Sequence, residues 1–243
     1  MNIPRSDRFL SVLAMLAPIA LFCGTASAAP LQNGGFETGT FTPWTTTGTA
    51  TVTGTSNGVA PAEGSFQAVL NTPSGGTVFQ GSMETFLGLA GSSLSTYNSG
   101  GGSGGGSAFK QTFDITAGQI LTFRWNFLPN GSNASNGQND TAFFTLHLAG
   151  DTSSTAIFTL ASTASTGGVA TGYQTYMSGP LAAGTYLLGF ADYDQKMVAG
   201  AFNAQRPTLL IDGVAVVPEP ATVTLLAFGA IGGAACWFRR RRS

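Results

Sequence analysis

The chain has 243 residues, of which 43% are hydrophobic and only 9% are charged, so it can bury one sizeable core. Its two cysteines, Cys23 and Cys236, lie in apolar segments near the two ends, so disulfide bonds cannot stabilise the body between them. Between Glu37 and Asp212 there are nine acidic and four basic residues, and this negative balance excludes a nucleic-acid partner.

The first segment has the three parts of a secretory signal peptide. Arg5 and Arg8 precede an apolar run from Phe9 to Cys23, and residues 26–28 form a small-x-small cleavage site. We therefore predict that residues 1–28 are a signal peptide and that the remainder is exported. An uncleaved anchor helix is the less favoured alternative, because the apolar run is short.

Residues 29–216 alternate hydrophobic and polar side chains with a period of two, which is typical of half-buried strands. In residues 120–128, Trp125 shares its side with the phenylalanines, so we expect it in the core. In residues 141–150, His147 falls on the polar side. Similar patterns occur in residues 66–71, 77–80, 108–115, 155–160, 173–178, 184–193 and 207–216. Many short strands separated by turn formers predict an all-β fold, an antiparallel β-sandwich.

Two stretches of the body depart from this strand pattern. Residues 82–89 place Met83, Phe86 and Leu87 on one face, which predicts a short helix. Residues 91–107 consist mostly of glycine and serine, so we expect a flexible loop inserted between strands.

The last segment has the pattern of a membrane span. Residues 221–238 contain no charged side chain, and as a helix they would be about 27 Å long, close to the thickness of a bilayer's hydrocarbon core. The cluster that follows consists of Arg239, Arg240, Arg241 and Arg242. By the positive-inside rule this cluster stays cytoplasmic, which places the body on the other side of the membrane.

The motif before this span carries a family resemblance. Pro218, Glu219 and Pro220, then the apolar helix and the arginine cluster, resemble the PEP-CTERM sorting signal of Gram-negative bacteria over residues 217–243. The resemblance implies recognition of the Pro-Glu-Pro motif by an exosortase, which cuts nearby and releases or transfers the body. Two prolines favour an extended segment just outside the membrane, where a processing enzyme can reach it. A permanently anchored protein is the alternative.

The body resembles secreted jelly-roll domains similar to carbohydrate-binding modules, on the opening motif in residues 33–44 and the closing motif in residues 209–216. The resemblance implies a structural calcium ion held by Glu37 and Asp212, with Asn33 as a backbone ligand. Calcium prefers such hard oxygen ligands. Turn hydrogen bonds made by the same side chains are the alternative.

No catalytic residue is predicted. The one histidine, His147, has no neighbouring nucleophile motif, and the few carboxylates are scattered along the chain. Asp140, Asp192 and Asp194 form a second acidic group, which we interpret as solvated loop carboxylates, with a second metal site as the less favoured alternative. Among the aromatic residues we expect Trp44 to be buried, and none identifies a ligand site, so the ligand-binding residues stay unknown.

These observations predict an exported, exosortase-processed protein of the cell surface or the extracellular biofilm matrix. Its expected role is non-catalytic association with carbohydrate or exopolysaccharide. A purely structural coat or adhesion protein is the alternative, and a glycan-active enzyme comes third. The expected partners are signal peptidase, the exosortase, the membrane before processing, and exopolysaccharide, with one structural calcium ion as the expected cofactor.

Overall fold

The structure is a computed structural model, and it describes residues 29–72, 78–97, 103–129, 139–197 and 207–218. Its elements in chain order are β1 (Thr45–Thr47), β2 (Thr49–Thr53), β3 (Gln67–Asn71), β4 (Val78–Phe79), α1 (Gln80–Leu87), the 3-10 helix η1 (Ser95–Tyr97), β5 (Ser103–Ile115), β6 (Gln119–Leu128), β7 (Thr141–Leu148), β8 (Ile157–Ser162), α2 (Thr163–Thr166), β9 (Gln174–Met177), β10 (Gly184–Met197) and β11 (Thr208–Pro218).

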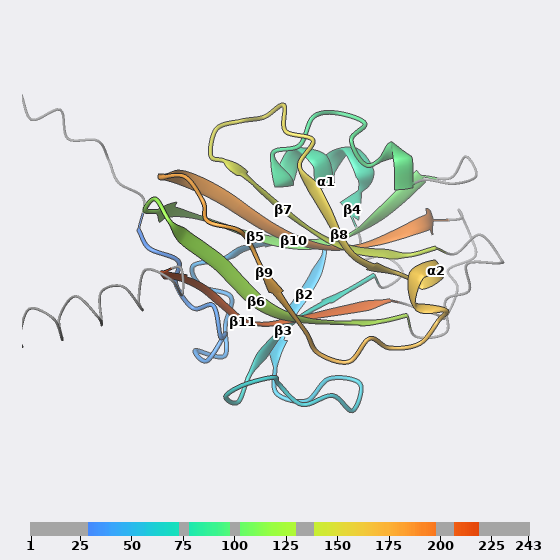
Figure 1. The fold of residues 1–243 in the computed structure, drawn as a ribbon. Coiled ribbons are helices and arrows are strands. Elements are labelled where there is room, and N and C mark those ends of the chain that lie inside the picture. The colour runs from blue at the N-terminus through green and yellow to red at the C-terminus, as the bar shows by residue number, and fades with distance from the viewer. Residues whose placement is uncertain (1–28, 73–77, 98–102, 130–138, 198–206, 219–243) are drawn as a thin grey trace, which may run out of the picture.

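The strands form two sheets that lie face to face, above and below each other in Figure 1. The upper sheet has the order β1-β5-β10-β7-β8, with β4 also pairing with β5, and the lower sheet has the order β2-β3-β11-β6-β9. Every pairing between these strands is antiparallel. The predicted all-β antiparallel sandwich is therefore confirmed.

Aromatic side chains fill the space between the sheets. Phe123 of the lower sheet meets Phe190 of the upper sheet edge to face, with ring centroids 4.8 Å apart at 86°. Phe109 packs at 5.1 Å from Phe190 and at 5.2 Å from Trp44. Buried aromatic rings of this kind contribute large apolar areas and favour offset or edge-to-face contacts. They stabilise a body whose described residues contain no cysteine.

Helix α1 covers the outer face of the upper sheet (Figure 1). Met83 and Leu87 are fully buried there against Phe143 and Tyr193, which confirms the helix predicted from the apolar spacing. The same helix buries His147, which is only 7% exposed. The prediction of a polar strand face at His147 was wrong, because a short helix folds back onto that face.

The glycine-serine stretch also differs from the prediction. Residues 91–97 form turns and η1, and residues 103–107 are the first part of β5, not a loop. Glycine is required here, because a Cβ atom on Gly106 would lie 1.9 Å from the backbone oxygen of Asp192 on β10. The small residues therefore let two central strands approach closely.

Both described ends of the body lie beside the turn between β5 and β6. The N–H of Asp114 donates to the carbonyl of Ala29, and Pro218 is the register partner of Gln119. Strand β11 thus continues two residues past the predicted end of the body, into the Pro-Glu-Pro motif. In the part of the chain that the structure describes, no helix is long and apolar enough to cross a membrane.

Several predicted features lie outside the described residues. They are the signal peptide at 1–28, Glu219 and Pro220 of the sorting motif, the apolar segment 221–238, and the arginine cluster 239–242.

Candidate functional site

A cleft of about 470 Å³ opens between the two sheets at their β8 and β9 edges. We call it the edge cleft. Its lining residues come from β6, β8, α2 and the segment that leads into β9: Trp125, Leu160, Ala161, Ser165, Thr166, Val169, Ala170, Thr171 and Gln174. Its volume is within the range of small-ligand sites in proteins.

Trp125 reaches this cleft because of its place in the lower sheet. It lies on the inner face of β6, and its register partner is Gln174 of β9, the edge strand. Among the described strands the sheets end at β8 and β9, so none of these strands lies beyond the indole, and Trp125 is only half-buried. The prediction that Trp125 is buried in the core was wrong, although the predicted side of the strand was right.

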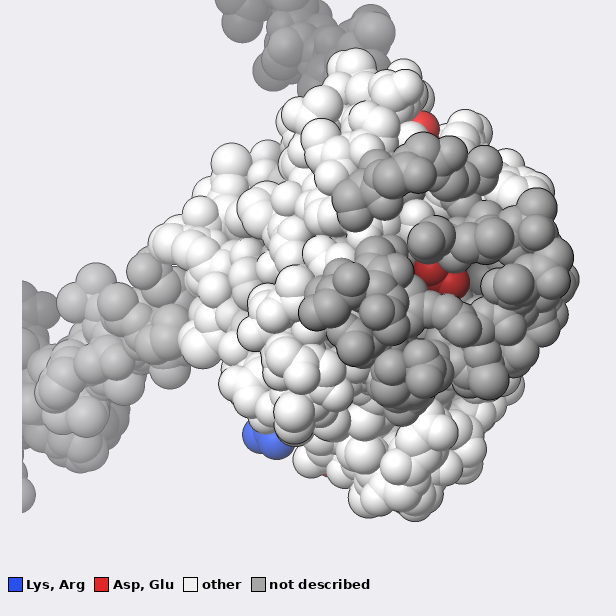
Figure 2. Space-filling model, turned by 90° about the vertical axis from the view of Figure 1, so that its right-hand side faces the viewer, with Lys and Arg blue, Asp and Glu red and all other residues white. Residues whose placement is uncertain are grey.

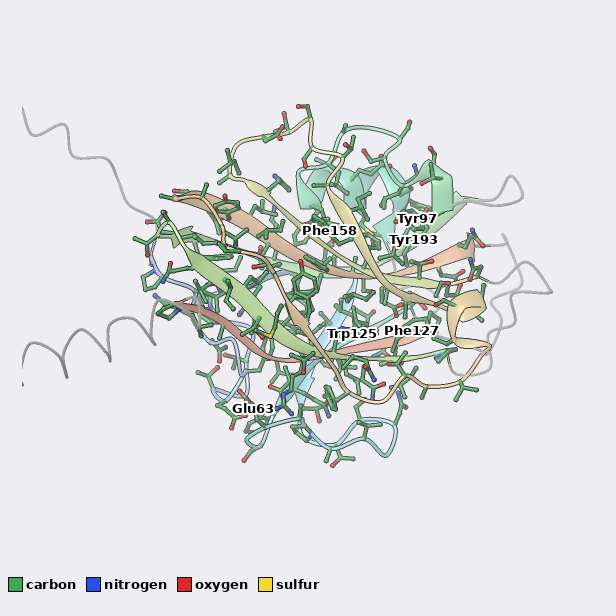
Figure 3. All side chains as sticks on the ribbon, viewed as in Figure 1. Glu63, Tyr97, Trp125, Phe127, Phe158 and Tyr193 are labelled. Carbon is green, nitrogen blue, oxygen red and sulfur yellow. The ribbon has the colours of Figure 1, made fainter. Side chains whose placement is uncertain are left out.

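Two more aromatic side chains lie at the same edge between the two sheets. Phe158 of β8 stacks on Phe144 with centroids 4.8 Å apart at 16°, and Tyr176 of β9 lies 4.6 Å from the same ring. Phe158 is 43% exposed. In Figure 3, Phe158 lies with the upper sheet and Trp125 with the lower sheet, so the open edge has apolar aromatic surface on both sides.

Polar side chains border the aromatic surface and are held by local hydrogen bonds. Ser165 is fixed by the capping box at the start of α2, in which Ser162 and Ser165 each accept the other's backbone N–H. The hydroxyl of Thr171 accepts the N–H of Phe127 at 2.9 Å, and the amide of Gln174 donates to the Thr171 carbonyl at 3.0 Å. The polar border is therefore tied to β6 and to α2.

The edge cleft is chemically neutral. None of the described residues that line it has an ionisable side chain. Burial raises the pKa of the neighbouring Tyr176 phenol above its ordinary value of 10.0, so this group stays protonated at neutral pH and can donate a hydrogen bond. Such a surface suits stacking and hydrogen bonding, whereas general acid-base chemistry needs a titratable group.

The predicted calcium residues Glu37 and Asp212 both hold the loop of residues 62–66. The carboxylate of Glu37 accepts the N–H groups of Ser65 and Phe66 at 3.0 Å. The carboxylate of Asp212 accepts the N–H of Glu63 at 3.0 Å and that of Gly213 at 2.8 Å. The loop thus joins the opening motif to the last strand through hydrogen bonds. Calcium at this place stays a prediction.

Burial raises the pKa of Asp212, and its backbone N–H donors oppose that shift. Glu63 adds a second carboxylate next to it: a Cβ atom on Gly213 would lie 3.1 Å from Glu63 Oε1. The hard oxygens of Glu37, Glu63 and Asp212 are the ligand type that calcium prefers.

Asn33 is less suitable as a calcium ligand. Its carbonyl oxygen accepts the N–H of Phe36 at 3.3 Å and the indole N–H of Trp44 at 3.1 Å. Its side-chain amide donates to the carbonyls of Thr40 and Thr42. Both lone pairs of the carbonyl are in use, so Asn33 shapes the opening turn instead. Trp44, 4% exposed, is buried as predicted.

The second acidic group lies inside the fold, so the prediction of solvated loop carboxylates was wrong. Asp192 is completely buried and Asp140 is 3% exposed, while Asp194 is half-buried. Asp192 and Asp194 alternate with outward-facing residues of β10, so both lie on the side of Phe190, between the sheets. The sequence "ADYD" continues the period-two pattern of a central strand, and this pattern could have predicted that Asp192 and Asp194 face the interior.

No closely spaced trio of histidine, cysteine or acidic side chains suited to holding a metal is present among the residues that the structure describes.

Residues 216–242 match a family described as the PEP-CTERM protein-sorting motif. The chain carries a PEP-CTERM sorting motif. The resemblance noted in the sequence is thereby confirmed, and the motif implies export and exosortase processing at the membrane of a Gram-negative bacterium. Pro218 of the motif ends β11, so the processed segment begins directly at the sandwich.

Three solved structures are similar at low identity. TmCBM61 in complex with β-1,4-galactotriose has 13% identity and a TM-score of 0.43, over 79% of this chain and 100% of its own. The enzymatically active domain of tailspike protein 4 from bacteriophage CBA120 has 12% and 0.41, over 78% and 21%. The Stig cyclase Fisc from Fischerella sp. TAU has 13% and 0.36, over 80% and 99%. No curated protein matches the chain significantly.

Proposed function

We propose that this protein is an exosortase-processed component of the cell surface or extracellular matrix that binds exopolysaccharide through the edge cleft, without catalysis. The observation that carries the proposal is the half-buried indole of Trp125 at the open edge, bordered by hydroxyl and amide groups. Sugar rings present apolar C–H faces and a rim of hydroxyls. An aromatic surface with a polar border is complementary to both features.

The place of the cleft in the molecule supports this proposal. The sorting motif leaves the body at Pro218, whose register partner is Gln119 at the start of β6. Trp125 lies six residues further along the same strand, about 20 Å away at 3.3 Å per residue. A body held at the membrane through its last strand would therefore keep the cleft away from the attachment point.

The neutral lining supports binding over hydrolysis. Glycoside hydrolysis uses two facing carboxyl groups, and the described lining of the edge cleft contains none. A low overall charge, 9% of residues, also suits partners that are recognised by stacking and hydroxyl contacts.

A structural calcium ion at Glu37 and Asp212 is the second part of the proposal. The two side chains reach the 62–66 loop from opposite ends of the body's sequence, with Glu63 beside them. An ion bound by their oxygens would strengthen the connection between the opening turn and β11. Loss of calcium at this site in an Asp212→Asn variant is the expected result.

Trp125→Ala tests the sugar proposal. The purified protein is run in gels that contain single exopolysaccharides, neutral and acidic, and retardation gives the affinity. We expect the variant to bind about tenfold more weakly than the wild type, a loss of about 1.4 kcal/mol, because one stacking surface is removed. Urea unfolding of both proteins checks that the fold is kept.

Phe79→Ala is the matched control, because Phe79 is an exposed aromatic residue, 62% exposed, on β4 and outside the cleft. It should bind as the wild type does. An equal loss in both variants contradicts binding through the edge cleft. No retardation of the wild type by any polysaccharide contradicts the whole proposal and favours a structural coat protein without a small ligand.

A further inference from the structure

We infer that the buried carboxylates of Asp192 and Asp140, at the end of the sandwich away from the sorting motif, form a binding site for a divalent cation of the calcium type. This site is separate from Glu37 and Asp212 and does not depend on sugar binding at the edge cleft.

The strongest observation is that the buried carboxylate of Asp192 has no hydrogen-bond donor. Its exposed fraction is 0%, and neither of its two carboxylate oxygens has a hydrogen-bond partner. A buried carboxylate without a donor is costly, because it loses the water that solvated it and gains nothing in return. A native structure that keeps such a group in a central strand indicates a partner that binds to its oxygens.

The surroundings of Asp192 are acidic. Asp140 precedes β7 and Asp194 follows on β10. Burial raises the pKa of Asp192 most, and the negative charges of Asp140 and Asp194 raise it further. Asp140 Oδ1 accepts the N–H of Gln195 at 3.4 Å, which fixes it beside β10. Acidic residues are visible on the face at this end of the sandwich (Figure 2). This field attracts a cation.

Other oxygens at this end of the sandwich belong to hydroxyl and carbonyl groups, the hard type that calcium prefers. The register partner of Asp192 on β5 is Ser107, whose hydroxyl donates to the carbonyl of Asn71 at 2.5 Å. The next residue, Thr72, is 5% exposed, and its hydroxyl is a second buried polar atom without a partner. Calcium takes six to eight oxygen ligands, including hydroxyls, carbonyls and water, so two carboxylates are sufficient anionic ligands.

Calcium counting with Asp192→Asn tests the inference. The full chain is freed of metal with chelator and dialysed against calcium chloride, and bound calcium per chain is measured together with the melting temperature. We expect Asp192→Asn to bind one ion fewer than the wild type. At calcium about a hundredfold above the Kd, the wild type should melt at least about 5 °C higher than its chelated form, and the variant should lose most of this gain.

Asp151→Asn is the matched control, since it makes the same substitution at an exposed turn. It should bind as many ions as the wild type. If Asp192→Asn does not fold, Asp140→Asn tests the same site, because its amide oxygen can still accept the N–H of Gln195. Asp212→Asn reports on the Glu37 site separately.

The inference is overturned by a wild type that binds no calcium, or by an Asp192→Asn protein that binds as many ions as the wild type. A loss of calcium confined to Asp212→Asn also overturns it and assigns the ion to the opening turn. An equal loss in Asp151→Asn shows unspecific surface binding and has the same consequence. The result of the polysaccharide test with Trp125→Ala is independent of all these outcomes.

Discussion

Asp212 and Asp192 are both completely buried aspartates on central strands, one in each sheet, but their surroundings are opposite. The Asp212 carboxylate accepts the backbone N–H of Glu63, from the loop folded around it, and that of Gly213, the next residue on β11. The Asp192 carboxylate accepts none. Burial raises the pKa of both, and only at Asp212 do backbone donors oppose the shift. The first carboxylate has hydrogen-bond donors from the chain itself, whereas the second has none and is left for the cation that we infer.

The largest effect is expected for Asp212→Ala. It leaves the N–H groups of Glu63 and Gly213 without their acceptor, in two partly buried hydrogen bonds to the fully buried Asp212, which costs about 1–3 kcal/mol each. We expect the free energy of unfolding to fall by about 4 kcal/mol in urea titrations with chelator. Asp192→Ala under the same conditions should change it by less than about 1 kcal/mol, because no hydrogen bond is lost. Equal losses in the two variants would break the comparison.

Gly106→Ala comes next in expected effect. Its Cβ atom would lie 1.9 Å from the Asp192 backbone oxygen, and backbone of paired strands cannot move aside without breaking the ladder. We expect a loss of about 3 kcal/mol by urea unfolding, the range for overpacked interiors. Gly81→Ala serves as control, because nothing lies within 4 Å of its Cβ position. A stable Gly106→Ala protein would show that β5 and β10 are further apart at Asp192.

Gly213→Ala should have the smallest effect. Gly213 has φ of +57°, which strains an alanine by about 1 kcal/mol, and the new Cβ lies 3.1 Å from the movable side chain of Glu63. Thermal unfolding should show a decrease of about 2–4 °C. A decrease as large as that of Gly106→Ala would mean that the Asp212 loop tolerates no adjustment, and the contrast between the two aspartates would be weaker.

The two tryptophans show how far sequence patterns reach. Trp44 follows the opening motif and is buried, as predicted, because its indole N–H bonds to the carbonyl of Asn33. Trp125 has the period of a core residue and does lie on the inner face of its strand. It is half-exposed only because β6 is next to the edge strand β9. Periodicity gives the face of a strand, but strand order in the sheet decides whether that face is covered.

The acidic residues Asp140 and Asp192 show the opposite case, in which residues expected to be exposed are buried. From the sequence, Asp140 and Asp192 are interpreted as solvated loop carboxylates. In the fold, β10 is 14 residues long and carries its alternation on through Asp192 into the space between the sheets. A local pattern cannot show this, because the cover over Asp192 comes from segments distant in the sequence.

The sequence by itself determined the sorting motif and the β-sandwich class. The motif is read from linear order, and the sandwich from a period of two, and both are local properties of the chain. Only the tertiary structure decided that His147 lies under α1, that Trp125 faces an open edge, and that Asp192 is buried without a partner. These three facts depend on which strands are neighbours and which element covers each face, and such long-range packing leaves no periodic signal in the sequence.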